Sequence, residues 1–345
     1  MRLKRLQKKL STEGLDALLV SRSINISYLT GFRGDDSWLL VTRDKPFLIT
    51  DFRYKEEVKR TAPQVELCIT DGPIYESACK IVQRVRVKRL GFESRWLSYA
   101  FWEKLRDISH GTGLVPVKDT VESLREIKDS SEIALIKKAV SITRKAFEYL
   151  EGILKQGISE RELAIELDYF LKRSGARKGA YDIIVASGIN SSLPHAPVTN
   201  KKLMPHEPVL VDMGVDYEGY ISDLTRVFFL GKMDAIATKI YKIVFEAQRR
   251  AISKIKPGIK ISSIDKAARE YIEKKGYGPF FGHAVGHGVG MEVHEKPHVS
   301  KRNDKELVPG MVFTVEPAIY LPKWGGIRIE DMAIVTEKGC EILGV

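Results

Sequence analysis

Two acidic residues interrupt neighbouring apolar runs in the second half of the chain. Asp212 lies within the run at residues 209–215, and Asp223 lies within a second run after a polar turn. If the chain reverses between Tyr217 and Glu218, the two carboxylates face each other across an antiparallel pair, with Cβ atoms about 5 Å apart. An unpaired buried charge is strongly unfavourable, so a bound cation would keep both acids ionised. The pair alone is equally compatible with acids that end strands at a solvated rim.

A second acidic pair follows about a hundred residues later along the chain. Glu316 and Glu330 each lie in an apolar run, and residues 321–325 join the two runs. A tight reversal centred on Lys323 sets Glu316 opposite Glu330. Because two acidic hairpins in one domain are hard to ascribe to chance, this second pair favours a metal site over a solvated rim.

Glycine-rich sequence separates the two acidic pairs and also carries histidines. Glycines at 282, 286, 288 and 290 disfavour a helix and allow the backbone to pass close to a ligand. A histidine beside four carboxylates suits manganese, cobalt, iron or zinc better than calcium or magnesium, which favour oxygen ligands only.

The segment from His294 to His298 matches the pattern H-E-x-x-H in its letters. That zinc motif requires a helix, which aims both imidazoles at one ion. Pro297 and the glycines upstream disfavour such a helix. We therefore expect no helical zinc site here.

Two domains are expected from the pattern of helix and strand signals. The first third combines an amphipathic opening at residues 3–10 with strand-like runs at 17–20, 38–41 and 46–50, which predicts an α/β domain. Residues 128–132 form a helix-capping sequence before a long periodic stretch at 133–154. We place the domains at residues 1–122 and 123–345. In the second domain we expect helices at 160–172, 236–255 and 264–275 and a strand at 183–185.

Composition limits the classes of function. The formal net charge of +11 is spread along the chain and interleaved with acids, which disfavours nucleic acid as a partner. Cys68, Cys79 and Cys340 are unclustered, so neither a disulfide framework nor a thiolate metal site is expected. The apolar run at residues 15–20 is too short for a signal peptide, and no run approaches the roughly 18 residues of a membrane span. We expect a cytoplasmic protein without a membrane partner.

The acidic and histidine motifs together resemble those of the pita-bread metallopeptidases, in the branch that contains prolidase (Xaa-Pro dipeptidase) and aminopeptidase P. The resemblance covers nearly the whole chain. The matching motifs are YLTGF at 28–32, IVASG at 184–188, LPH at 193–195, VDMG at 211–214, SDLTR at 222–226, GHGVG at 286–290, VHE at 293–295, FTVEP at 313–317 and GIRIE at 326–330.

The resemblance implies an α/β (α+β) fold, with a creatinase-type N-terminal domain and a pita-bread catalytic domain. It implies two divalent metal ions per subunit, manganese or cobalt with zinc or iron as alternatives, and commonly a homodimer. The substrates would be small peptides with proline in the second position. The implied metal ligands are Asp212, Asp223, His287, Glu316 and Glu330.

The resemblance also implies roles beyond the metal ligands. Two metal ions can generate a nucleophile and polarise the scissile carbonyl, and we expect Glu316 to carry the proton to the leaving nitrogen. We expect His294 to stabilise the oxyanion, His195 to hold the substrate, and Arg328 to neutralise carboxylate charge. An ordinary strand salt bridge is the alternative for Arg328, and a surface histidine is the alternative for each loop histidine. Further substrate-binding residues are expected at Tyr181, His283 and His298.

Several positions depart from the family pattern, although none of them removes a ligand. Ala318 stands where glycine is usual, Asp35 and Asp36 replace small residues, and Tyr181 stands where phenylalanine is common. His298 lies where some prolidases have an arginine linked to substrate binding, which leaves substrate preference open.

Alternatives to the dipeptidase remain. An aminopeptidase P acting on longer peptides shares the motifs, and the short N-terminal domain favours the dipeptidase. A non-catalytic module that binds peptides or histones should have lost ligands, whereas all of those implied here are present.

Overall fold

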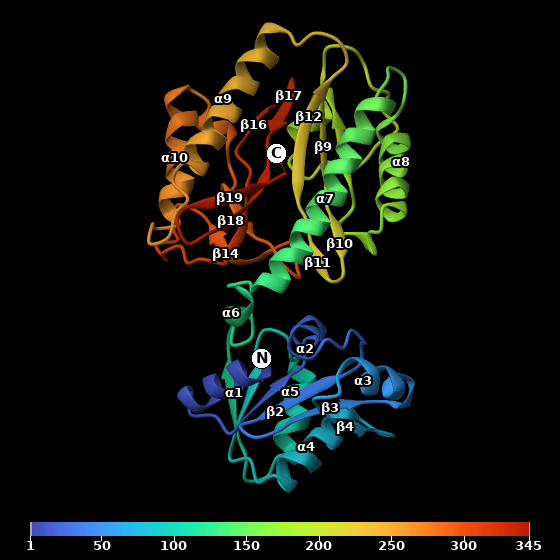
Figure 1. Ribbon diagram of the computed structural model, residues 1–345, viewed down its shortest axis with the longest axis vertical. Coiled ribbons are helices and arrows are strands. Elements are labelled where there is room, and N and C mark those ends of the chain that lie inside the picture. The colour runs from blue at the N-terminus through green and yellow to red at the C-terminus, as the bar shows by residue number, and fades with distance from the viewer. Residues whose placement is uncertain (1, 345) are drawn as a thin grey trace. The chain divides into compact units, whose positions relative to one another are not determined.

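The computed structural model describes residues 2–344 and comprises two compact units, which join in sequence between Arg125 and Glu126 (Figure 1). The expected junction between residues 122 and 123 falls inside the short helix α6 (Glu122–Arg125). This helix packs on the first unit, because the Tyr28 hydroxyl donates to the Leu124 carbonyl at 2.9 Å. Arg125 also donates to the side-chain oxygen of Asn25 at 2.9 Å.

The first unit is built on a mixed six-stranded sheet in the order β4-β3-β2-β1-β5-β6. Strands β1 and β2 are buried along their whole length, as expected for strands covered on both faces. The strands are β1 (Ala17–Val20), β2 (Trp38–Thr42), β3 (Pro46–Thr50), β4 (Glu66–Ile69), β5 (Arg89–Glu93) and β6 (Gly113–Val117). The remaining helices are α1 (Arg2–Thr12), α2 (Ser23–Thr30), η1 (Phe52–Tyr54), α3 (Lys55–Thr61), α4 (Ile74–Arg84) and α5 (Tyr99–Ile108). The predicted opening helix and the three predicted strands are confirmed as α1, β1, β2 and β3.

Helices flank the strands of the second unit on two sides. Figure 1 shows α7 (Ser130–Ile153) and α8 (Glu160–Arg173) on one side and α9 (Ala235–Ile252) and α10 (Ser262–Lys274) on the other. Each helix pair packs its apolar residues into a core of its own, which confirms the predicted helices. Short 3-10 turns lie at η2 (Gly188–Ser192) and η3 (Gly278–Phe280). In the described part of the chain, no helix is long and apolar enough to span a membrane.

The strands of the second unit form four small sheets, in the orders β12-β9-β8, β11-β10-β7, β14-β13-β15-β18-β19 and β16-β17. The earlier strands are β7 (Lys178–Gly179), β8 (Ile184–Ser187), β9 (Pro208–Met213), β10 (Val215–Tyr217), β11 (Tyr220–Ile221) and β12 (Leu224–Phe229). The later strands are β13 (Gly286–Gly288), β14 (Glu295–Val299), β15 (Val312–Val315), β16 (Ala318–Leu321), β17 (Gly325–Arg328), β18 (Asp331–Val335) and β19 (Cys340–Leu343).

The predicted cap at residues 128–132 starts helix α7. Asp129 accepts a hydrogen bond from the Glu132 amide at 3.0 Å, and the Glu132 side chain accepts one from the Asp129 amide at 2.9 Å. Such a reciprocal box satisfies amide groups that a helix start would leave unbonded. Glu132 also accepts a hydrogen bond at 2.8 Å from the buried hydroxyl of Tyr220, which ties the helix start to β11.

The register predicted for the first acidic hairpin is wrong. Asp212 pairs with Thr225, and the turn lies at Glu218 and Gly219. Both turn residues have positive φ values, 50° and 77°, as a two-residue turn of type I′ requires. This turn shifts the reversal by one position, so Asp223 lies diagonal to Asp212 and just before β12.

The register predicted for the second hairpin is confirmed. Ala318 pairs with Arg328 and Leu321 with Gly325, so the reversal is centred on Lys323. Beyond this ladder, the flanking strands β15 and β18 pair with each other, in a different sheet. Glu316 and Glu330 therefore lie in the breaks between two ladders, outside regular strand structure on both sides.

Candidate metal centre

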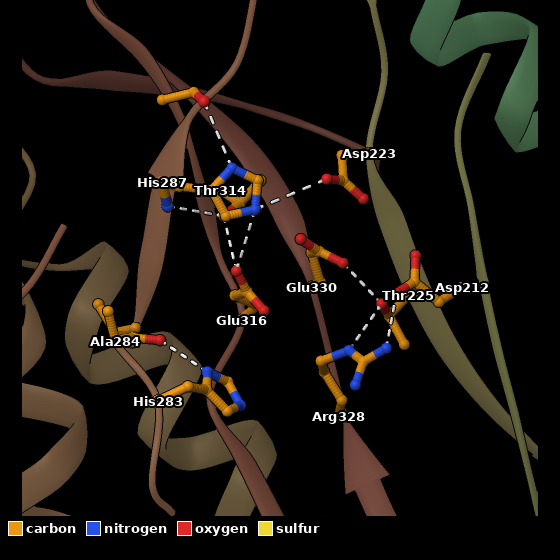
Figure 2. A network of polar contacts seen from close by, with 12 residues as sticks. Asp212, Asp223, Thr225, His283, Ala284, His287, Thr314, Glu316, Arg328 and Glu330 are labelled. Carbon is orange, nitrogen blue, oxygen red and sulfur yellow. Dashed lines mark hydrogen bonds and ion pairs between the residues drawn. The ribbon is translucent and has the colours of Figure 1, made fainter. Parts of the chain in front are cut away.

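Three separate segments of the second unit bring metal-ligating side chains together. Ligand atoms of Asp223, His287 and Glu330 all lie within 4.8 Å of one another. Asp223 precedes β12, His287 is the middle residue of β13, and Glu330 lies between β17 and β18. Figure 2 shows Glu316 and Asp212 beside the same group. The arrangement gathers four carboxylates and one imidazole.

His287 is held between two glycines for a steric reason. A Cβ atom at Gly286 would lie 1.9 Å from the Thr314 carbonyl oxygen, and one at Gly288 would lie 2.2 Å from that of Lys296. Only glycine therefore allows β13 to fit between its neighbouring strands β14 and β15. The glycines predicted a close approach of the backbone to a ligand, whereas the close approach in the structure is to the backbone of the strands on either side of β13.

The His287 ring faces the carboxylates through Nε2. This atom lies 3.3 Å from Glu316 Oε1 and 3.7 Å from Asp223 Oδ2, while Nδ1 lies 3.3 Å from the Gly288 carbonyl (Figure 2). Burial lowers the pKa of His287, but the Glu316 carboxylate outweighs it and raises that pKa to about 9. Burial likewise opposes ionisation of Glu316, yet the bond to His287 lowers its pKa to about 2. The two groups form an ion pair at neutral pH.

The other carboxylates repel one another. Burial, and then the charge of Asp212, raise the pKa of Asp223 to about 7. Burial and the charge of Asp223 raise the pKa of Glu330 well above its ordinary value. The Tyr181 hydroxyl lies within hydrogen-bonding distance of both aspartates, 2.6 Å from Asp212. Excess negative charge of this kind is what a cation would neutralise.

In the metal-free protein, the raised pKa of Asp223 should make the stability of the fold depend on pH. A pKa raised on folding stabilises the folded protein at low pH, and this contribution is lost as the pH rises through the folded value. Relative to an Asp223→Asn variant, we expect the wild-type free energy of unfolding to fall from about pH 4 to about pH 7, by up to roughly 1.4 kcal/mol for each pH unit in this interval. Denaturant unfolding of both proteins across this range, without and with Mn²⁺, measures the effect. Parallel profiles without metal would contradict it.

Arg328 neutralises the opposite end of the cluster. The residue is 3% exposed, and Nη2 donates to Asp212 Oδ2 at 2.6 Å. Its Nε donates to the Thr225 hydroxyl at 3.1 Å, and that hydroxyl donates to Glu330 Oε2 at 2.6 Å. The guanidinium therefore acts on two carboxylates, one directly and one through Thr225. Thr225 was not predicted from the sequence. Its position opposite Asp212 follows only from the correct turn type, which sets the register of the hairpin.

A cavity of about 1070 Å³ opens over this cluster. The predicted substrate residues all line it, and His195, His294 and His298 are exposed there. The His294 ring lies 4.2 Å from that of His287, centroid to centroid. The cavity lining that sequence analysis did not predict includes Ile183, Ile184, Pro194, Pro197, Val198, Val293 and Tyr320.

Two of the cavity histidines have a lowered pKa. For His283 and His294 the largest cause is burial, which disfavours the charged ring. Nε2 of His283 lies 3.3 Å from the Tyr320 hydroxyl, which itself accepts a hydrogen bond from Arg328 at 2.6 Å. Strand β14 includes four of the five residues from His294 to His298, so this segment is not helical, as Pro297 and the glycines upstream predicted.

Comparison with known proteins agrees with the predicted family. Residues 134–337 match the profile described as "Metallopeptidase family M24", and residues 2–127 match "Creatinase/Prolidase N-terminal domain". The chain is 37% identical to the Xaa-Pro dipeptidase of Pyrococcus furiosus, over 99% of this chain and 97% of that protein.

Two solved structures are similar along nearly their whole length. A Xaa-Pro dipeptidase from Bacillus anthracis superposes with a TM-score of 0.96 at 38% identity, covering 99% of this chain and 96% of the other. An X-Pro aminopeptidase from Thermotoga maritima has a TM-score of 0.92 at 36% identity, with coverage of 99% and 97%. This chain belongs to metallopeptidase family M24, and it joins a creatinase/prolidase N-terminal domain to the catalytic domain of that family.

Proposed function

We propose that the chain is a Xaa-Pro dipeptidase, which hydrolyses the peptide bond before proline with the help of two divalent metal ions. The observation that carries the proposal is the convergence of Asp223, His287 and Glu330 on the floor of a large cavity. The similarity to Xaa-Pro dipeptidases along nearly the whole chain supports the choice of substrate.

The donor set fits divalent transition metals. Four carboxylates with one imidazole suit manganese or cobalt, and zinc or iron are alternatives, whereas calcium and magnesium favour oxygen alone. The acids repel one another in a buried place, which a cation would relieve. When bound, two ions supply a nucleophile at neutral pH and electrophilic activation of the scissile carbonyl. The residues proposed to hold them are Asp212, Asp223, His287, Glu316 and Glu330.

Glu316 is the proposed carrier of the proton. Glu316 lines the cavity beside the other candidate ligands, and a glutamate carboxylate, which is ionised at neutral pH, can accept a proton from the attacking water. The proline nitrogen must gain a proton before it can leave as an amine, because an amide anion is a very poor leaving group. Glu316 would deliver this proton to the proline nitrogen. Arg328 is proposed to hold Asp212 in place while the charge in the cluster changes.

Histidines on the cavity wall are proposed to recognise the substrate. His294, beside His287, would donate to the carbonyl oxygen as it becomes anionic. His195 and His298, which are exposed on the wall, would bind the backbone or the carboxylate of the peptide. Tyr181 and His283, which also line the cavity, are proposed as further substrate-binding residues. The apolar lining residues would contact the proline ring.

We further propose a homodimer in the cytoplasm. The three cysteines of the described chain are free, which agrees with a reducing compartment. The dimer is proposed from the family resemblance. Sedimentation of the purified protein measures the assembly state directly.

An aminopeptidase P activity is the second candidate. The similarity to the X-Pro aminopeptidase of Thermotoga maritima supports it, as does a cavity of about 1070 Å³, which is large for a dipeptide. The retained set of candidate ligands argues against a non-catalytic binding module.

Hydrolysis of Ala-Pro and Ala-Pro-Ala by Mn²⁺-loaded protein separates the two enzymes. We expect kcat/KM for Ala-Pro to be at least about ten-fold higher than for Ala-Pro-Ala. A preference of about 1.4 kcal/mol for a free carboxylate on the proline itself is enough to give this ratio. Ala-Ala, whose amide nitrogen carries a hydrogen, is the control for proline preference. Preference for the tripeptide would favour the aminopeptidase, and activity on neither proline peptide would overturn the proposed function.

A further inference from the structure

Gln248 is a polar member of the buried face of helix α9. Its exposed fraction is 3%, and its neighbours on that face are Ala237, Ile240, Ile243, Val244, Ala247 and Ala251. Burying an amide among apolar side chains is unfavourable unless the amide forms hydrogen bonds. Its partners therefore explain its presence.

The carboxamide of Gln248 reaches the backbone next to both candidate glutamate ligands. Nε2 lies 3.2 Å from the Val315 carbonyl oxygen and 3.3 Å from the Ile329 carbonyl oxygen. Val315 directly precedes Glu316, and Ile329 directly precedes Glu330. One side chain thus joins the two positions next to these acids.

The contacts lie at a break between two ladders: Val315 is the last residue of β15, where it pairs with Asp331, and Ile329 lies in the break, where its amide donates to the Pro317 carbonyl at 3.5 Å. Residues 316–317 and 329–330 lie between the β15·β18 ladder and the β16·β17 ladder. The Glu316 amide donates to the Val285 carbonyl at 2.8 Å, and the Glu330 amide donates to the Thr225 carbonyl at 3.2 Å. Each glutamate is therefore bonded to a different neighbouring segment, and the Gln248 amide adds a link between the residues that precede them.

A partly buried ion pair between Arg226 and Asp331 continues this network next to Glu330. Gln248 Nε2 lies 3.0 Å from Asp331 Oδ2, and Asp331 Oδ1 accepts a hydrogen bond from Arg226 at 2.5 Å. Arg226 also donates to the Glu330 carbonyl at 2.6 Å. The backbone of Glu330 is thus held on both sides.

We propose that Gln248 is a positioning residue, which sets the separation of the Glu316 and Glu330 carboxylates by hydrogen bonding to the backbone carbonyl that precedes each of them. Gln248 is not among the residues that line the cavity, so it would act only through the two glutamates. The inference rests on the proposed metal centre. Loss of a group that orients metal ligands typically lowers metal affinity by about 10- to 100-fold.

The test compares Gln248→Met with wild-type protein in calorimetric titrations with Mn²⁺. Methionine keeps the volume of the side chain but has no amide donor. We expect at least about a ten-fold weaker Kd for Mn²⁺, and a larger change in kcat than in KM for Ala-Pro. Gln248→Asn keeps an amide but shortens its reach, so it should show the same loss, and it carries the test if the methionine variant does not fold.

Val244→Ala is the matched control, because it removes packing one turn earlier on the same buried face. This variant should lower Tm and leave the Mn²⁺ affinity unchanged. Gln248 variants with a lowered Tm and wild-type Mn²⁺ affinity would overturn the inference in favour of a structural role. Wild-type protein that bound no Mn²⁺ would overturn the proposed function itself, and with it this inference.

Discussion

Glu316→Gln should lower kcat for Xaa-Pro hydrolysis by about 10²- to 10⁴-fold while the protein remains folded. A glutamate carboxylate is ionised at neutral pH and can accept the proton, whereas a glutamine of the same shape cannot. The measurement is kcat on Ala-Pro at saturating Mn²⁺, with the metal content of each sample determined in parallel.

The metal content decides how a loss of activity is interpreted. A variant that retains its metal but loses turnover supports the role of Glu316 in proton transfer, whereas a variant that loses metal reports its role as a ligand. Near-normal turnover with metal bound would contradict the proton-transfer role. Glu341→Gln, which changes an exposed ion pair with Lys137, is the control and should have little effect.

The local elements of this fold were predictable from sequence because their signals are local. The Asp129 cap uses residues within one turn of the helix, and the reversal at Lys323 follows from the spacing of two apolar runs. The reversal at Glu218 and Gly219 was misplaced by one position. Glutamate rarely adopts the positive φ that a type I′ turn needs, so the turn lacked its usual Asn-Gly or Asp-Gly signature.

The surroundings of the candidate ligands could not be predicted from local patterns. Gln248 contacts residues 67 to 83 positions away along the chain, and the Thr225 hydroxyl reaches Glu330 across 105 positions. Periodicity identifies Gln248 only as a polar residue on an apolar helix face. The candidate histidines of the cavity came from the family resemblance, because a histidine in a loop carries no sign of its own about what it faces.

Removal of metal should abolish hydrolysis, which is the second large effect expected. Without a cation, burial and the charges of neighbouring carboxylates raise the pKa values of Asp223 and Glu330, so the site holds partly protonated acids. His287 then forms an ion pair with Glu316, so the carboxylate that should accept the proton already has a positively charged partner. Chelation followed by removal of the chelator should leave a folded and inactive protein, and Mn²⁺ or Co²⁺ should restore its activity.

The most direct test of the central claim is a titration of this chelated protein with Mn²⁺, in which hydrolysis of Ala-Pro and the bound metal are followed together. If each chain binds two metal ions, activity should rise with bound Mn²⁺ and reach its plateau at about two equivalents of Mn²⁺ per chain. Full activity in the chelated protein, or Mn²⁺ binding that restores no Ala-Pro hydrolysis, would contradict the account.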